Sequence, residues 1–170
     1  MSEFYGASLR NYLAEWRSIG APETVLQWLE HGVSIPFHSV PTEPSHQSNK
    51  RFNDKEKQFL DKEISDLCRQ KCIVKCQGKP FIVSPISTVP KKDGSYRLVT
   101  DLRLLNKLCT PTKFLYENIN NVVNIVQPKD KLVTLEIKKN GFFHIPVKEE
   151  HRQFLGFEYN PSNMPFWCKF

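Results

Sequence analysis

Residues 89–107, VPKKDGSYRLVTDLRLLNK, decide how this chain folds. Two runs that favour β-strands, residues 81–89 and 96–102, flank a polar segment that contains Asp93-Gly94. This dipeptide is a strong signal for a tight hairpin turn. Because lysines stand directly before the turn and an arginine follows it, the stretch predicts a β-hairpin with a positively charged end.

Working outward from the hairpin, charge is spread unevenly along the 170 residues. The formal net charge is +6, but residues 1–50 hold three Lys/Arg and five Glu, whereas residues 51–170 hold 21 basic and 13 acidic residues. Residues 91–113 alone carry six basic and two acidic residues. This stretch suits a polyanionic partner. A solvated surface with no partner is the alternative, since Lys and Arg are mostly exposed in any protein.

Composition narrows the class of protein. Hydrophobic residues make up 39% and charged residues 25%, which is typical of a folded globular chain. The apolar runs are far shorter than the roughly 18 residues that cross a bilayer. The first 16 residues, MSEFYGASLRNYLAEW, contain acidic side chains and no apolar stretch typical of a secretory signal. We therefore expect no membrane partner and a cytoplasmic or nuclear location.

Apolar spacing and turn residues predict an α+β chain in two parts. Residues 1–50 should form a helical arm and a linker, and residues 51–170 the main domain. Asn53 and Glu56 have the spacing of a reciprocal helix cap, which places a helix start there. The predicted helices cover residues 9–19, 22–32, 54–71 and 117–126. The predicted strands cover residues 81–89, 96–102, 132–137, 142–147 and 153–159, with a polar connection at 148–152.

The cysteines pose a choice between metal ligands and ordinary thiols. Cys68, Cys72 and Cys76 stand four residues apart and would share a helical face if the helix ran that far. A tetrahedral zinc site needs a second, distant pair of ligands, and no matching pair exists in the sequence. The total of five cysteines is odd and no signal peptide precedes them. We therefore expect reduced structural thiols.

The hairpin stretch resembles the fingers hairpin of reverse transcriptases. In that family two lysines precede a turn, an aromatic-Arg pair opens the return strand, and Asp-x-Arg-x-Leu-Asn follows. The matching positions are Lys91, Lys92, Tyr96, Arg97, Asp101, Arg103, Leu105 and Asn106. The resemblance implies that Lys91, Lys92 and Arg97 bind the phosphates of an incoming deoxynucleoside triphosphate. It also implies that Asp101 and Arg103 lie along the template strand.

A second block, residues 132–157 (LVTLEIKKNGFFHIPVKEEHRQFLGF), resembles the first palm motif of the same family. There the family has a metal-binding Asp, and this chain has Glu136, one methylene longer. The resemblance implies that Glu136 and the backbone of Ile137 bind Mg²⁺, which polymerases use with hard oxygen ligands. One extra residue separates Glu136 from Pro146, near Lys138-Lys139. Counting back from Pro146 places Phe142 at the aromatic gate that excludes a ribose 2′-hydroxyl.

The resemblance covers residues 52–170 and implies the fingers and partial palm of a right-hand polymerase, preceded by the short helical arm. Patches at residues 16–20 and 32–37, with the helix at 117–126, are similar to tyrosine-recombinase retrotransposons of the DIRS type. An RNA template, an RNA–DNA hybrid and deoxynucleoside triphosphates are the implied partners. The family's Tyr-x-Asp-Asp carboxylates do not occur in this sequence. We therefore expect a partial RNA-directed DNA polymerase that is inactive alone.

Two other hypotheses remain open at this point. The chain could be a non-catalytic nucleic-acid-binding module in which the basic hairpin binds the phosphate backbone and the chemistry is lost. It could also be a translated fragment without function, with an exposed sheet edge that lowers its solubility. The polymerase hypothesis and the binding-module hypothesis differ in whether Glu136 matters for activity.

Overall fold

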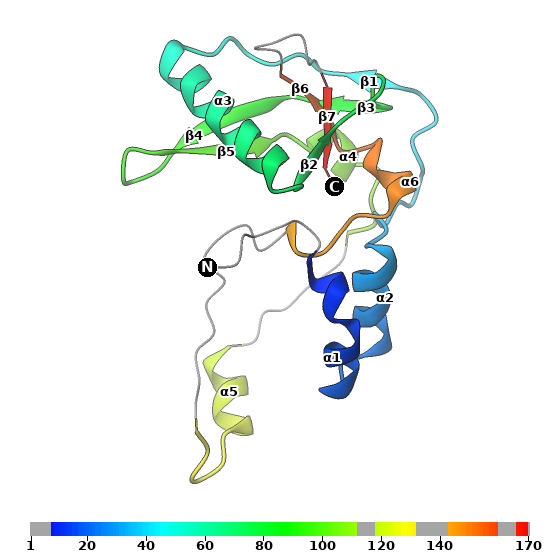
Figure 1. The fold of residues 1–170 in the computed structure, drawn as a ribbon, viewed down its shortest axis with the longest axis vertical. Helices are drawn as coiled ribbons and strands as arrows, with labels where there is room; N and C mark the ends of the chain where they lie inside the picture. The colour runs from blue at the N-terminus through cyan, green and yellow to red at the C-terminus, as the bar shows by residue number, and fades with distance from the viewer. Residues whose placement is uncertain (1–7, 112–117, 132–142, 160–165, 170) are drawn as a thin grey trace.

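The computed structural model describes residues 8–111, 118–131, 143–159 and 166–169, and its fold is mixed α/β (Figure 1). Its helices are η1 (Ser8–Tyr12), α1 (Leu13–Ser18), α2 (Glu23–His31), α3 (Asp54–Arg69), α4 (Arg103–Asn106), α5 (Ile119–Ile125) and α6 (Glu149–Arg152). Its strands are β1 (Ser45–His46), β2 (Ile73–Lys75), β3 (Ile82–Ser84), β4 (Ile86–Pro90), β5 (Tyr96–Thr100), β6 (Gly156–Glu158) and β7 (Phe166–Lys169). The predicted mixture of helices and strands is confirmed.

The strands form a five-stranded sheet and a separate hairpin. The sheet has the order β1-β3-β6-β7-β2, and β4 pairs only with β5. The pairs β1–β3 and β3–β6 are parallel, and β6–β7 and β7–β2 are antiparallel. The run at residues 81–89, predicted as one strand, divides at Pro85 into β3 and β4. Proline has no N–H for a continuous ladder, so the chain leaves the sheet there and enters the hairpin.

Helix α3 packs its apolar side against the hairpin and the sheet. Asn53 accepts a hydrogen bond from the Glu56 backbone N–H, and the Glu56 carboxylate accepts one from the Asn53 N–H, both at 2.9 Å. The predicted reciprocal cap is thus confirmed. Leu60, Ile64 and Leu67 follow at helical spacing and are buried. They form one core with Cys72, Ile73, Ile86, Phe157 and Tyr159.

The N-terminal arm joins the rest of the chain through a short extended segment. As predicted, the arm contains two short helices, α1 and α2, although the first begins as the 3₁₀ turn η1. After α2, Val33 forms an isolated parallel bridge with Val147. Gly32 has φ +89°, and a Cβ there would lie 2.7 Å from the Lys148 backbone nitrogen. Glycine is therefore required for the arm to approach this closely.

A second apolar cluster secures that junction. It consists of Ile82, Leu105 and Phe154, with Ile35, Phe37, Phe81, Leu102 and Leu155 packed around them. The His151 Nδ1 accepts a hydrogen bond of 2.8 Å from the Ile35 backbone N–H. The strap at residues 36–50, predicted as an irregular linker, adds the short edge strand β1 to the sheet.

Several predicted elements differ from the structure. Residues 142–147 were expected to form a strand, but the described residues 143–147 contain a 3₁₀ position, bends and the single bridge at Val147. Pro146 within this run explains the difference, because proline cannot donate to a ladder. The polar connection at 148–152 contains the short helix α6. The strand at 153–159 shortens to β6, and the strand predicted at 132–137 lies outside the described residues.

The prediction that all the cysteines are reduced thiols is wrong. Helix α3 ends at Arg69, so Cys72 and Cys76 do not continue its face. Cys76 is disulfide-bonded, whereas we expected five reduced thiols. Cys68, Cys72 and Cys109 are not disulfide-bonded. None of the helices in the described ranges is both long enough and apolar enough to cross a membrane.

Candidate nucleic-acid interface

The β4–β5 hairpin ends in a tight, internally bonded turn. The Lys91 N–H donates to the Ser95 carbonyl at 2.7 Å, and the Gly94 N–H donates to the Lys91 carbonyl at 3.1 Å. The Asp93 carboxylate accepts from the Ser95 N–H at 3.0 Å and from its hydroxyl at 2.6 Å. These bonds to Ser95 lower the pKa of Asp93. Gly94 has φ +79°, as the Asp-Gly signal requires.

Alternation along the strands gives the hairpin two different faces. Thr88 pairs with Leu98 and faces the core, whereas the next pair, Val89 and Arg97, is exposed. Lys91 and Lys92 are exposed as well. An open depression at the hairpin end is lined by Val89, Pro90, Lys91, Lys92, Asp93 and Arg97. The structure therefore brings together the three cations for which the sequence predicted phosphate binding.

These cations form no close ion pairs with carboxylates among the residues that the structure describes. None of Lys91, Lys92 and Arg97 forms an ion pair with another residue in the described part of the chain. Asp93, the acidic residue in the depression, has its carboxylate hydrogen-bonded to Ser95, and the nearby Lys91 charge adds a smaller electrostatic attraction. Three positive charges on a short exposed hairpin attract anions, and most strongly polyanions. We therefore treat this end of the hairpin as the candidate site.

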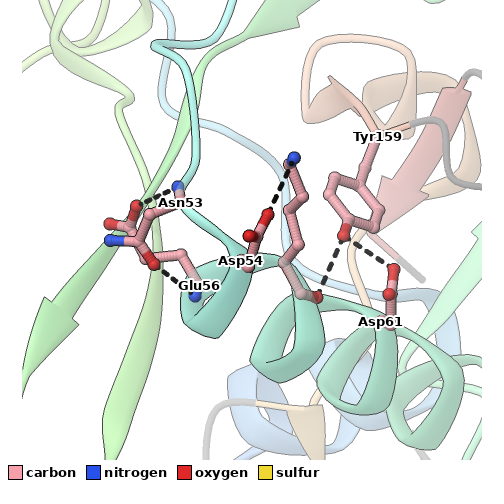
Figure 2. A network of polar contacts seen from close by, with 6 residues as sticks. Asn53, Asp54, Glu56, Asp61 and Tyr159 are labelled. Carbon is pink, nitrogen blue, oxygen red and sulfur yellow. Dashed lines mark hydrogen bonds and ion pairs between the residues drawn. The ribbon is translucent and has the colours of Figure 1, made fainter.

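The hairpin is fastened to helix α3 through a polar and an aromatic contact. The buried Glu56 carboxylate accepts a hydrogen bond from the Thr88 hydroxyl of β4 in addition to its bond from Asn53. These two hydrogen bonds, with Thr88 the larger cause, lower the pKa of Glu56. The rings of Phe59 and Tyr96 meet with their centroids 5.7 Å apart. Figure 2 shows Asn53 and Glu56 at the start of α3, beside the hairpin strands. The sequence predicted the cap but gave no signal for Thr88.

Asp101 and Arg103 form a close pair just after β5. The Arg103 Nε lies 2.9 Å and its Nη2 2.6 Å from Asp101 carboxylate oxygens, and the Arg103 backbone N–H also donates to this carboxylate. The hydrogen bonds from Arg103 lower the pKa of Asp101 to about 2, and Asp101 raises the pKa of Arg103. The Arg103 side chain remains 87% exposed. Asp101 thus orients a guanidinium that a solvent-side partner can still reach.

A second depression, which no sequence motif indicated, lies at the start of α3. Its lining consists of Asn49, Lys50, Arg51, Phe52, Lys57, Asp61, Glu158 and Tyr159. The Tyr159 hydroxyl donates its hydrogen to the Asp61 carboxylate at 2.7 Å and also lies 3.2 Å from the Lys57 carbonyl oxygen, as the dashed lines in Figure 2 show. Burial, with Asp61 nearby, raises the pKa of Tyr159. The acidic and basic side chains that line this depression are largely paired with other residues. The depression therefore attracts anions less than the end of the hairpin does.

The predicted metal site is not part of the described structure. Glu136, Ile137 and Phe142 lie outside the described residues. Within the ranges that are described, no group of three His, Cys, Asp or Glu side chains could hold a metal ion. The candidate site in the described structure is therefore the cationic end of the hairpin, without a metal site beside it among the described residues.

Comparisons with known proteins point to viral reverse transcriptases. No protein-family model matches the chain. The Gag-Pro-Pol polyprotein of squirrel monkey retrovirus is 36% identical over 74 residues, which are 44% of this chain and 4% of the polyprotein. The prototype foamy virus protease-reverse transcriptase matches 99% of this chain with a TM-score of 0.57 and 19% identity. A foamy viral protease-reverse transcriptase solved in complex with dsDNA matches with the same score and identity.

These similarities define the relationship at a coarse level. This chain covers 25% of the first foamy virus structure and 39% of the second, so it corresponds to part of those proteins. Its fold is similar to that of a region of viral protease-reverse transcriptases, and 74 of its residues are similar to part of a retroviral Gag-Pro-Pol polyprotein. These findings support the predicted resemblance to reverse transcriptases at the level of the fold, and the DIRS-type assignment stays a prediction.

Proposed function

We propose that this chain forms the fingers and the beginning of the palm of a retroelement reverse transcriptase, and that its β4–β5 hairpin binds phosphates. The observation that carries the proposal is the exposed group of Lys91, Lys92 and Arg97, which has no ion pair within the described residues. A partner with phosphates would supply the missing negative charge. Such contacts are sequence-independent and position a nucleic acid rather than read it.

The fold comparison supports a nucleic acid as the partner. Two foamy viral protease-reverse transcriptases of similar fold were solved in complex with dsDNA. For this chain we propose a duplex, either an RNA–DNA hybrid or DNA, as the larger ligand. Deoxynucleoside triphosphates, an RNA template and the DIRS-type origin follow from the sequence resemblance. In this proposal Arg103, held by Asp101, contacts the template backbone beside the hairpin.

Catalysis is a separate part of the proposal. Polymerisation would require Mg²⁺ near Glu136 and the Ile137 backbone, with Phe142 beside the sugar. The proposed phosphate binding uses the side-chain cations of the hairpin and is a separate function from this metal chemistry. We propose that the chain by itself binds nucleic acid without extending a primer. A binding module that has lost catalysis would show the same phosphate binding at the hairpin. It would differ from a polymerase only in that substitution of Glu136 would not affect activity.

Binding to labelled duplexes across a salt series tests the proposal. We expect salt-dependent binding of the purified chain to an RNA–DNA hybrid and to double-stranded DNA. Arg97→Ala should weaken binding and reduce the slope of log K against log salt by about 1, because one phosphate contact is lost. Lys91→Ala and Lys92→Ala should act in the same direction. Arg17→Ala is the control for loss of an exposed arginine on α1, where Arg17 forms an ion pair of 3.9 Å with Glu30.

Two results would contradict the proposal. If the wild-type chain does not bind, or if Arg17→Ala weakens binding as much as Arg97→Ala, the hairpin is not a specific phosphate site. Primer extension is measured in parallel with Mg²⁺. Extension by the chain alone would overturn our proposal that it is inactive, and loss of that extension in Glu136→Ala would favour the polymerase over the binding module.

A further inference from the structure

Glu56 occupies a junction between three segments of the chain. Its carboxylate accepts hydrogen bonds from the Asn53 N–H, the Thr88 hydroxyl and the Lys50 ammonium, the last at 3.3 Å. Glu56 is 8% exposed and Thr88 6% exposed. The strap before α3, the first turn of α3 and strand β4 thus meet at one buried carboxylate.

A helix cap alone does not require this arrangement. In a reciprocal cap the third helical residue needs only to accept from the N-cap N–H, and such a side chain usually lies at the surface. Here the other carboxylate oxygen, Oε1, accepts from both Thr88 and Lys50. Burying a carboxylate is costly unless donors satisfy it, and hydrogen bonds to a charged group are the stronger kind. The pairing with Thr88 therefore adds a specific attachment of the hairpin to the cap.

The attachment lies next to the cations. Thr88 precedes Val89, which pairs with Arg97 across the hairpin. At the base, the Ile86 N–H donates to the Asn49 side chain at 2.8 Å. A strand advances about 3.3 Å per residue, so the Thr88 anchor lies within one residue step of the Arg97 level. The other contacts that hold the hairpin are apolar or lie at its base: Leu98, opposite Thr88, packs against the core, and the rings of Phe59 and Tyr96 meet.

We propose that Glu56 is a positioning residue that holds the cationic hairpin in the orientation that binds phosphates, acting through the Thr88 hydroxyl. This inference rests on the proposed function, because it assigns a role in the same binding site. Glu56 contacts no ligand in this scheme. Its effect passes through β4 to the backbone that carries Arg97, Lys91 and Lys92.

Substitution of Thr88 separates this role from direct binding. Thr88→Val keeps the shape of the side chain and removes the hydroxyl, and Thr88→Ser keeps the hydroxyl. We expect Thr88→Val to weaken binding to double-stranded DNA by about 3- to 10-fold. The salt slope should stay unchanged, because no phosphate contact is removed. Thr88→Ser should bind like the wild type.

A double-mutant cycle and a stability control complete the test. Glu56→Gln retains a residue suited to the cap and removes the charge. If both residues act through one bond, the Glu56→Gln/Thr88→Val double variant should bind no more weakly than the weaker single variant. Ile64→Val, in the buried face of α3, is a control for loss of stability away from the hairpin, and it should bind like the wild type.

The possible failures are distinguishable. If wild-type chain shows no salt-dependent binding, the proposed function fails and this inference fails with it. If wild-type chain binds but Thr88→Val binds equally well, or Ile64→Val is weakened to the same degree, only the positioning role is overturned. Amide hydrogen exchange gives a second readout: Thr88→Val should speed exchange in β4 and β5 and Thr88→Ser should not. Unchanged exchange in Thr88→Val would also overturn the inference.

Discussion

Helices α3 and α5 begin in the same way and are buried very differently. Asn53 and Glu56 cap α3 through two reciprocal hydrogen bonds of 2.9 Å. At α5, the Asn118 side chain accepts from the Asn121 N–H at 3.3 Å, and the Asn121 side chain accepts from the Asn118 N–H at 3.2 Å. Both caps satisfy N–H groups that a helix start otherwise leaves unpaired.

The two helices differ in what covers their apolar residues. Leu60, Ile64 and Leu67 of α3 lie under the hairpin and sheet. On α5, Ile119 is 72% exposed and Ile125 71% exposed. In Figure 1, α5 lies apart from both sheets. Local signals therefore specify where each helix begins, whereas the stability of a helix depends on a partner from elsewhere in the chain.

The largest expected difference between the helices is in core truncation. Leu60 is 0% exposed, so Leu60→Ala should lower the free energy of unfolding by about 2–5 kcal/mol through lost burial and a cavity. Val123→Ala on α5 should change it by less than about 0.5 kcal/mol, because Val123 is 66% exposed. Urea unfolding followed by circular dichroism measures both values.

The two variants control for each other, since each removes apolar atoms from a helix. Equal losses would contradict the comparison and show that α5 contributes to the cooperative core. A Leu60→Ala loss below about 1 kcal/mol would mean that the core closes over the vacated space far better than cavities usually do.

The next effect is the loss of a cap. Asn53→Ala should lower the free energy of unfolding by about 0.5–2 kcal/mol, because the Glu56 N–H loses its acceptor. Asn118→Ala removes the corresponding acceptor at α5. We expect it to loosen α5 locally and to leave the global unfolding midpoint nearly unchanged, because α5 shares little core. Faster amide exchange at 119–125 without a midpoint shift would confirm this, and a midpoint shift as large as that of Asn53→Ala would contradict it.

The same comparison explains how much of the fold the sequence could predict. Apolar spacing and cap residues are local, and they located α3 and α5 within a few residues of their ends. They could not show which helix is covered, because burial depends on contacts between distant segments. The predicted strand at 142–147 failed for a related reason. Its apolar content suits a strand, but Val147 forms only an isolated bridge, to the arm at Val33.

The candidate site shows the same limit. The order of lysines, Asp-Gly turn and arginine predicted the hairpin and its exposed cations, since turn chemistry and charge can be read locally. The pairing of Thr88 with Glu56 joins positions 32 residues apart and had no sequence signal. Asp101 and Arg103 were both predicted as site residues, but their bidentate pairing depends on the backbone turn between them.

A smaller expected effect is a pH dependence of stability at the buried cap of α3. The hydrogen bond from Thr88 lowers the pKa of Glu56 below its ordinary value of 4.5. A lowered carboxyl pKa stabilises the folded state fully above the unfolded value, and this contribution is lost as the pH falls through the folded value. We therefore expect Thr88→Val to be less stable than wild type at pH 7, with the difference shrinking below pH 4.5. Urea unfolding at pH 7 and pH 3 measures this, and a constant difference would contradict it.

The exposed pair of Asp101 and Arg103, just after β5, allows a prediction of a pKa change that does not involve the core. Arg103 holds the pKa of Asp101 at about 2, against an ordinary value of 3.8. In Arg103→Ala the Asp101 pKa should rise towards 3.8, because the largest stabilising donor is removed. Side-chain NMR titration follows it directly. Arg103→Lys keeps the charge but not the paired N–H geometry, so it should give an intermediate pKa. An unchanged Asp101 pKa in Arg103→Ala would mean that backbone donors, not the guanidinium, set its value.

The smallest expected effect on stability is at the exposed face of α5. Ile125→Gln replaces a 71% exposed β-branched residue with a better helix former, so the free energy of unfolding should change by less than about 0.5 kcal/mol. Removing an exposed apolar group should at the same time reduce self-association at high concentration, which sedimentation velocity measures. Ile64→Gln on α3 is the matched opposite and should unfold the chain or destabilise it strongly, because it buries an amide in the core. A strong destabilisation by Ile125→Gln would show that the apolar face of α5 is covered in solution, and the contrast between the two helices would then lie in their partners rather than in their exposure.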